Sequence, residues 1–449
     1  MNETSERTQR RGGGGGGSKS QDGEGRPRRN RRNRSGRNKN GRRRNRNQNQ
    51  NQNQNQGQFR DQDREFDQRN YNRADDTPTG PATDEEGLLE ISGKGFGFLR
   101  VPERAYKPSP KDVFVTPEIV RKFGLRDGLW VKCEARQGGR GPQLTELKSI
   151  NGRRPDAYIT LPMFEELKAV NPDKRLVLET TPDRLTTRTI DMMAPIGRGQ
   201  RGLIVSPPRA GKTTLLQHIA EAVAENHPGI HLMVVLVDER PEEVTELTRE
   251  LPGAEIMSSS NDSDAKAHCR IAQLAIERAK RLVEAGEDVF MLMDSITRLG
   301  RAFNNAIRGG GRMGSGGIDN RALIIPRKLF AAARNTRDAG SLTIIGTALI
   351  DTNSRMDDVI FQEFKGTGNM ELVLDRKIAE QYIFPAVDIF KSGTRREELL
   401  LPPHQLEKIF LIRRGLAGHK PMEAIERLLG LMGRFPSNAQ MLLDLKPML

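Results

Sequence analysis

Cysteine, tryptophan and tyrosine are scarce in this sequence. The 449 residues include two cysteines, one tryptophan and four tyrosines. Cys133 and Cys269 stand far apart, and no C-x-x-C pair or His/Cys group has the spacing of a metal site, which argues against a structural zinc. So few cysteines suit a reducing compartment, and each is expected to be a small buried apolar residue.

Long apolar runs are also missing. No stretch of about 18 consecutive apolar residues occurs, so we expect no membrane-spanning helix. The N-terminus has no apolar core of the kind that a secretory signal needs. These absences predict a cytoplasmic protein with no membrane partner.

The positive charge is concentrated at one end of the chain. Residues 1–58 hold 16 Lys and Arg against 4 Asp and Glu, a net of +12, and subtracting this from the total of +14 leaves +2 for the rest. Residues 1–86 have too few apolar side chains to form a core, so we predict a disordered Arg/Asn/Gln-rich tail. Its basic block could hold RNA phosphates without reading sequence, and the alternative is a solubilising tail with no fixed partner.

The remaining sequence divides into three predicted parts. Residues 87–152 carry short apolar segments between Gly, Pro and Asp, which predict a small β-barrel. Residues 153–185 are interpreted as a connector. Residues 186–449 alternate apolar strand runs with helix-length segments, which is typical of a parallel α/β sheet.

A phosphate-binding loop stands at the start of the α/β part. A predicted strand, 202–205, runs into the loop and a helix follows from Leu215, which is the order found in P-loop proteins that bind ATP. Lys212 is expected to reach the β- and γ-phosphates and Thr213 to hold Mg²⁺. The other loop residues expected to contact the phosphates are Arg209, Ala210, Gly211 and Thr214.

Carboxylates end two further apolar strands. Glu239 closely follows one strand and Asp294 ends another, and ligands bind at the carboxyl ends of strands in open α/β sheets. We predict that Asp294 holds Mg²⁺ and that Glu239 activates the attacking water. The alternative for Glu239 is a salt bridge with Arg240.

A cation supplied to the transferred phosphoryl group would complete the site. Arg395 and Arg298 are equally good candidates by residue type and position. Thr394 and Glu397 have the spacing of a capping box, which predicts an ordinary helix start there and would hold Arg395 in its first turn.

Two regions could bind nucleic acid. Phe96 and Phe98 alternate with glycines and precede Arg100, so these rings could stack on single-stranded bases, or else form the barrel core. Phe114 could supply a third ring. The Gly-rich loop 304–318 and the loop 351–355 could line a pore or be plain surface loops.

Several segments together resemble the bacterial Rho family of transcription termination factors over roughly residues 87–449. The resemblance rests on residues 93–100, 199–202, 238–246, 294–298, 364–369 and 392–395. It implies an OB-fold, cold-shock-like barrel followed by a RecA-like P-loop ATPase domain. It also implies a homohexameric, RNA-dependent ATPase and 5′–3′ RNA–DNA helicase that binds nascent single-stranded RNA and releases it from the RNA polymerase elongation complex.

The resemblance also implies roles for individual residues. Lys212, Glu239 and Asp294 keep the roles above, and Arg395 becomes the finger from a neighbouring subunit. Further nucleotide contacts implied by the family are Gly197, Arg198, Gly199, Gln200, Arg201, Gly202, Arg240 and Phe384, the last facing adenine. The implied RNA contacts are Gly95, Phe96, Gly97, Phe98, Leu99, Arg100, Asp112, Val113 and Phe114 in the barrel, and Arg312, Met313, Gly314, Ser315 and Arg355 in the pore loops.

The sequence departs from the family in places. Residues 141–143 read Gly-Pro-Gln where a basic or aromatic patch is usual, which puts a third RNA contact in doubt, and Arg355 replaces a lysine. Two other functions stay open on the residues alone. One is an ATPase subunit of a rotary synthase or protein-export ring, and the other is a cold-shock-like RNA chaperone with a degenerate nucleotide site.

Overall fold

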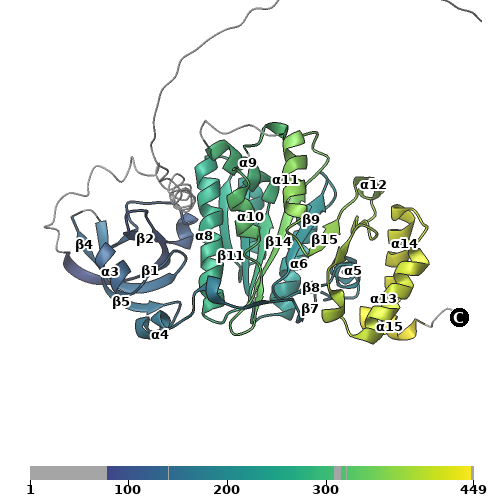
Figure 1. Cartoon of the computed structure of the whole chain (residues 1–449), viewed down its shortest axis with the longest axis horizontal. Helices are drawn as coiled ribbons and strands as arrows, with labels where there is room; N and C mark the ends of the chain where they lie inside the picture. The colour runs from purple at the N-terminus through teal and green to yellow at the C-terminus, as the bar shows by residue number, and fades with distance from the viewer. Residues whose placement is uncertain (1–77, 140, 308–314, 320, 446–449) are drawn as a thin grey trace, which may run out of the picture. The chain divides into compact units, whose positions relative to one another are not determined.

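A computed structural model describes residues 78–139, 141–307, 315–319 and 321–445 (Figure 1). Most of the predicted basic tail lies outside the described residues. Within those that are described, no helix is both long enough and apolar enough to cross a membrane. The described chain forms a β-barrel followed by a larger α/β sheet domain.

Five strands close the predicted barrel in the order β1-β2-β3-β5-β4. They are β1 (Thr79–Ile91), β2 (Gly97–Arg100), β3 (Val113–Val115), β4 (Trp130–Gly138) and β5 (Gly141–Ile150), with the short helices η1 (Pro102–Arg104) and α3 (Pro117–Lys122) between them. The first strand starts ahead of the predicted boundary at Gly87, because its early residues pair with β4. Val131, Cys133 and Ala135 alternate with exposed residues along β4 and fill the barrel core.

A seven-stranded sheet forms the second part, in the order β11-β10-β12-β14-β9-β15-β16. The strands are β9 (Arg201–Ser206), β10 (His231–Glu239), β11 (Glu255–Ser260), β12 (Val289–Asp294), β14 (Leu342–Leu349), β15 (Met370–Val373) and β16 (Gly393–Thr394). All neighbouring strands pair in parallel except β16, which runs antiparallel to β15 at the edge. The predicted parallel α/β fold is confirmed.

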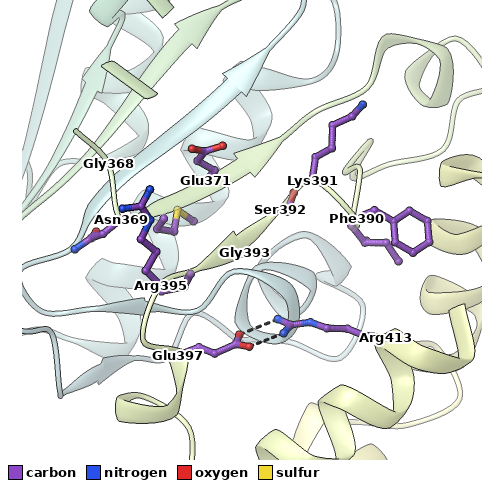
Figure 2. Close-up of a pocket in the computed structure, with 13 residues that line it drawn as sticks. Gly368, Asn369, Glu371, Phe390, Lys391, Ser392, Gly393, Arg395, Glu397 and Arg413 are labelled. Atoms are coloured by element: carbon purple, nitrogen blue, oxygen red, sulfur yellow. Dashed lines mark hydrogen bonds and ion pairs between the residues drawn. The ribbon is translucent and has the colours of Figure 1, made fainter. Parts of the chain in front are cut away.

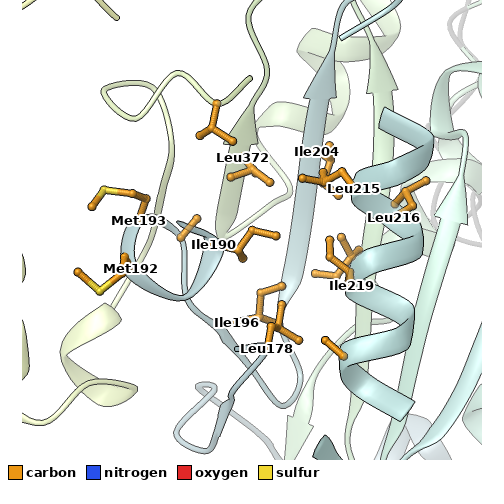
Figure 3. Close-up of a cluster of buried hydrophobic side chains, with 14 of the residues drawn as sticks. Leu178, Ile190, Met192, Met193, Ile196, Ile204, Leu215, Leu216, Ile219 and Leu372 are labelled. Carbon is orange, nitrogen blue, oxygen red and sulfur yellow. The ribbon is translucent and has the colours of Figure 1, made fainter. Parts of the chain in front are cut away.

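Helices cover both faces of this sheet, which explains why its strands are apolar throughout. Val234 and Leu236 pack into one core, whereas Met233 and Val235 pack into the core on the opposite face. The helices between or beside the strands are α5 (Leu185–Met193), α6 (Lys212–Asn226), α7 (Pro241–Glu250), α8 (Ala265–Glu284), α9 (Ile296–Ala306), α10 (Ile324–Phe330) and α11 (Arg355–Lys365). Figure 3 shows the first core, where Ile204 of β9 and Ile219 of α6 lie beside Ile190 of α5.

Shorter elements lie before and after the main sheet. The connector contains α4 (Pro155–Ile159), η2 (Phe164–Glu166), β6 (Ala169–Val170) and β7 (Arg175–Leu176), and its two strands pair with β13 (Asn335–Thr336) and β8 (Ile196–Gly197). The chain ends in the helices α13 (Pro403–Leu416), α14 (Pro421–Met432) and α15 (Asn438–Asp444), after the short α12 (Arg376–Ala379). Proline opens α13 and α14, where a missing N–H costs no helical bond.

Two glycines provide a matched test of packing around the sheet. A Cβ on Gly340 would lie 1.8 Å from the backbone oxygen of Glu287, whereas a Cβ on Gly229 would meet nothing within 4 Å. We expect Gly340→Ala to lower the free energy of unfolding by about 1–3 kcal/mol, because backbone must shift to make room. Urea unfolding followed by circular dichroism measures this, with Gly229→Ala as the control. Equal stability of the two variants would contradict the close approach.

Candidate functional site

The phosphate loop joins the carboxyl end of β9 to the first residue of α6. Gly211 precedes the helix with a φ of +85°, a backbone conformation that favours glycine. A Cβ at this position would also lie 3.3 Å from ring atoms of Phe384. The half-exposed Phe384 ring therefore lies beside the loop, which fits the adenine-facing role implied by the family.

The carboxylate of Asp294 meets the phosphate loop at the same sheet edge. The strands β9, β14, β12 and β10 are parallel, so their carboxyl ends converge. Lys212 and Asp294 form an ion pair, and the hydroxyl of Thr347 donates to Asp294 Oδ1 at 2.6 Å. Thr347 was not predicted from the sequence, because it lies inside an apolar strand with nothing local to distinguish it.

Glu239 lies in the same site with little access to solvent. Its exposure is 4%, and Arg298 NH2 donates to its Oε1 at 3.4 Å. Burial, together with the neighbouring charge of Asp294, raises the pKa of Glu239, although Lys212 and Arg298 oppose that rise. A glutamate with a raised pKa is well suited to accept a proton from water.

Other residues of the phosphate loop differ in their exposure to solvent. Thr213 and Thr214 are exposed in the first turn of α6, and Arg209 is exposed in the loop. A threonine hydroxyl and an aspartate carboxylate are hard oxygen donors, so Thr213 and Asp294 suit Mg²⁺. Arg240 extends to Glu243 at 3.6 Å and does not form the salt bridge with Glu239 that was the alternative interpretation.

One group of predicted nucleotide contacts lies at the opposite end of β9. The group is Gly197, Arg198, Gly199, Gln200, Arg201 and Gly202. The phosphate loop follows the carboxyl end of this strand, roughly 16 Å from its first residue. The backbone N–H of Gly199 donates to Thr343 Oγ1 at 2.8 Å, and Gln200 Nε2 donates to Asn369 Oδ1 at 2.7 Å. Polar groups of this segment thus join strands and loops to one another, and its contact with nucleotide stays a prediction.

Arg395 also lies away from the chain's own phosphate loop. It follows the edge strand β16, where Thr394 pairs with Met370 and Met370 pairs with Gly202 at the start of β9. Its side chain is exposed, and its backbone N–H donates to Asn369 at 2.9 Å. Arg298, by contrast, contacts Glu239 within the site. The two finger candidates therefore occupy different ends of the sheet.

A cavity of about 450 Å³ opens beside Arg395 (Figure 2).

The predicted capping box formed by Thr394 and Glu397, next to this cavity, is wrong. The 3₁₀ helix η4 (Glu397–Leu399) begins after Arg396 without a side-chain cap. The Glu397 carboxylate accepts hydrogen bonds from Arg413 at 2.5 and 2.8 Å, and Thr394 donates to the carbonyl of Pro195.

Three phenylalanine rings form a cluster on the barrel. Phe96, Phe98 and Phe114 have ring centroids 5.6–5.8 Å apart. Phe98 and Phe114 are half-buried, whereas Phe96 is only 3% exposed. The expectation of an exposed stacking ring is therefore wrong for Phe96, which supports the other two rings from beneath.

Arg100 lies against this cluster in a fixed orientation. Its guanidinium carbon is 5.0 Å from the Phe98 ring centroid, and its NH1 donates to Asp112 Oδ2 at 2.6 Å. The side chain of Asp112 is fully buried, so it can orient Arg100 but cannot itself be an exposed RNA contact. Leu99 and Val113 are likewise buried in the barrel core.

Two glycines near the ring cluster, and the Gly-Pro-Gln segment that departs from the family, have clear structural surroundings. Gly95 has a φ of +87° in the turn before β2, and a Cβ on Gly97 would lie 2.7 Å from Leu89. Gln143, in the Gly-Pro-Gln segment, pairs directly with Phe114. A polar side chain thus stands next to the ring cluster where the family usually has a basic or aromatic patch.

Two predicted pore-loop segments lie against each other. Arg312, Met313 and Gly314 fall outside the described residues. Ser315 begins the short helix η3 (Ser315–Gly317), and a Cβ on Gly316 would lie 2.9 Å from the backbone oxygen of Arg355. Arg355 is exposed at the start of α11.

These features define a RecA-like P-loop ATPase joined to an OB-fold barrel, and comparison with known proteins agrees. Residues 186–394 match the nucleotide-binding domain of the ATP synthase alpha/beta family, and residues 85–156 match the RNA-binding domain of the Rho termination factor. The chain is 49% identical to transcription termination factor Rho of Aquifex aeolicus, over 80% of this chain and 83% of that protein. It is 50% identical to the factor of Cereibacter sphaeroides, over 79% and 85%.

Solved structures support the fold of the larger part. The assembled ATPase of the enteropathogenic E. coli type III secretion system aligns with a TM-score of 0.52 at 20% identity, covering 81% of this chain and 96% of that one. The chain belongs to the transcription termination factor Rho family, as relatives near 50% identity over most of both lengths require.

The ring cluster leads to a test of RNA contact. We expect Phe98→Ala to weaken binding of single-stranded oligocytidylate by about 1–3 kcal/mol, because a half-exposed stacking ring is lost. Fluorescence anisotropy with labelled RNA measures the change. Phe410→Ala removes a 42% exposed ring from α13 and serves as the control. Unchanged affinity in a Phe98→Ala protein with a normal circular dichroism spectrum would exclude stacking on this ring.

Proposed function

We propose that this protein is an ATP-driven RNA translocase and helicase that terminates transcription by pulling nascent RNA from the RNA polymerase elongation complex. One observation carries the proposal. The same chain holds Lys212, Glu239 and Asp294 at one sheet edge and the Phe98–Arg100 surface on a barrel. An ATPase with its own single-strand binding surface is what RNA-driven motion needs.

The chemistry at the sheet edge is assigned residue by residue. Lys212 turns from Asp294 to the β- and γ-phosphates when ATP binds. Thr213 and Asp294 would hold Mg²⁺, which would neutralise charge on the phosphates. Glu239 accepts the proton of the attacking water. Arg298, in contact with Glu239, keeps that carboxylate oriented.

A ring of six copies completes the site in this proposal. Arg395 is exposed at the opposite end of the sheet from the chain's own phosphate loop, so it can act as a finger only on the nucleotide of a neighbouring copy. The segments at Ser315 and Arg355 lie together and would face RNA in the central pore. A protein acting on transcription in bacteria works in the cytoplasm.

Two other functions have weaker support. A rotary or protein-export ATPase would share the α/β part, but it would not need the barrel or RNA. An RNA chaperone with a degenerate nucleotide site would not need Lys212, Asp294 and Glu239 to converge as they do.

The deciding experiment is ATP hydrolysis by the full chain with and without poly-cytidylate, together with the mass of the assembly. We expect strong stimulation by RNA and a mass of six chains. A rate of ATP hydrolysis that is the same with and without RNA would favour a rotary or export ATPase. No hydrolysis under either condition would favour the chaperone.

The proposed base has a specific kinetic signature. We expect Glu239→Gln to lower kcat by about 10²–10⁴-fold with little change in ATP affinity, because the proton acceptor is lost while the phosphate contacts remain. Glu243→Gln, a nearby glutamate on α7, is the control. ATP hydrolysis assays and nucleotide titration separate the two effects, and a kcat within a few-fold of the unmodified protein would reject Glu239 as the base.

The pH profile of the unmodified protein provides a check. Because the pKa of Glu239 is raised, protonation begins at higher pH than for an exposed glutamate. The acidic limb of kcat, measured across pH, should therefore lie at higher pH than an exposed glutamate would give.

A further inference from the structure

Glu90 on strand β1 contacts two arginines that come from different parts of the protein. Its Oε2 accepts from Arg100 Nε at 2.7 Å, within the barrel. Its Oε1 and Oε2 also accept from Arg270 Nε and NH2, at 2.6 and 2.7 Å. Arg270 lies on α8 of the ATPase part. A single carboxylate thus bridges Arg100, which lies against the Phe98 ring of the barrel, and a helix packed on the main sheet.

The bridge is well shielded from water. The side-chain exposures of Arg100, Glu90 and Arg270 are 11%, 20% and 16%. Burial disfavours the charged form of Glu90, but the two guanidiniums outweigh this and lower its pKa to about 2. Charge-assisted bidentate pairs of this kind are strong and geometrically specific. Arg270 NH2 also donates to the carbonyl of Tyr106 at 2.7 Å, which fixes it to the barrel backbone.

The other side of the same helical turn faces the chain segment that leads into Glu239. His268 stands two residues before Arg270, so the two side chains point about 200° apart around α8. His268 is buried, its Nδ1 lies 2.8 Å from Ser259 Oγ, and its Nε2 lies 3.9 Å from Asp238 Oδ1. Asp238 directly precedes Glu239. The first turns of α8 therefore contact the barrel through Arg270 and the Glu239 segment through His268.

We propose that Arg270 is a positioning residue that transmits RNA occupancy of the barrel to the ATPase site. RNA bound at Phe98 draws the Arg100 guanidinium toward its phosphates, which weakens the hydrogen bond between Arg100 and Glu90. The Glu90 carboxylate then binds Arg270 more tightly, and the start of α8 moves with Arg270. The shift alters how His268 meets Asp238 beside the catalytic glutamate.

This inference rests on the proposed function and names a residue through which RNA regulates hydrolysis. It differs from a role in RNA binding itself. Arg100 remains held by Glu90 and Asp112 when Arg270 is neutralised. Affinity for RNA and stimulation by RNA should therefore separate in a variant of Arg270.

The test compares Arg270→Gln with Arg270→Lys and with Lys266→Gln in the full chain. Lys266 is on the same helix, and among the residues that the structure describes no ion pair is seen for it. Each protein is measured for its Kd for labelled oligocytidylate, and for ATP hydrolysis as poly-cytidylate is raised. Arg270→Gln should bind RNA within about twofold of the unmodified protein, while its maximal RNA-stimulated rate falls at least about fivefold. Arg270→Lys should recover part of the stimulation, and Lys266→Gln should behave as the unmodified protein.

Each contrary outcome has a distinct meaning. Full stimulation of Arg270→Gln would overturn the proposal, as would a loss of stimulation that merely follows a loss of RNA affinity. An equal loss in Lys266→Gln would overturn it too, because any charge on α8 would then suffice. If the unmodified protein shows no stimulation by RNA, the proposed function itself fails, which the same titration reveals separately.

Discussion

The parallel pairing of β9 with its neighbours is the constraint on which the rest of the molecule depends. Parallel strands all end at one edge of a sheet, so loops that are distant in sequence converge there without any local signal. Lys212, Glu239 and Asp294 lie close together for this reason. The edge strand β16 runs antiparallel to β15, so Arg395, which follows β16, lies at the opposite end of the strands from the chain's own phosphate loop.

Much of this arrangement could be predicted from the sequence, because its signals are local. The phosphate loop needs a glycine and a lysine in fixed order, and buried parallel strands are apolar along their whole length. The capping box failed because it depended on tertiary contacts. Glu397 pairs with the distant Arg413 instead of capping a helix.

The barrel shows that a sequence pattern does not determine which side chains are exposed. Alternating glycine and phenylalanine indicate one face of a strand, but they cannot tell which rings that face exposes. The three-ring cluster resolves this, since Phe96 is buried beneath Phe98 and Phe114. Likewise, the family resemblance implies Asp112 as an RNA contact, but its side chain is a buried partner of Arg100. No sequence pattern indicated the roles of Thr347, Glu90 and Arg270, because their partners lie far away along the chain.

The short edge strand β16 has a consequence for how copies of this protein can meet. It contributes two residues, Gly393 and Thr394, so the sheet ends there with almost no free backbone to extend. A long edge would invite continuous strand addition and permanent fusion of one sheet to the next. In the proposed ring, a neighbouring copy at this edge would therefore be recognised through exposed side chains such as Arg395, not through added strands.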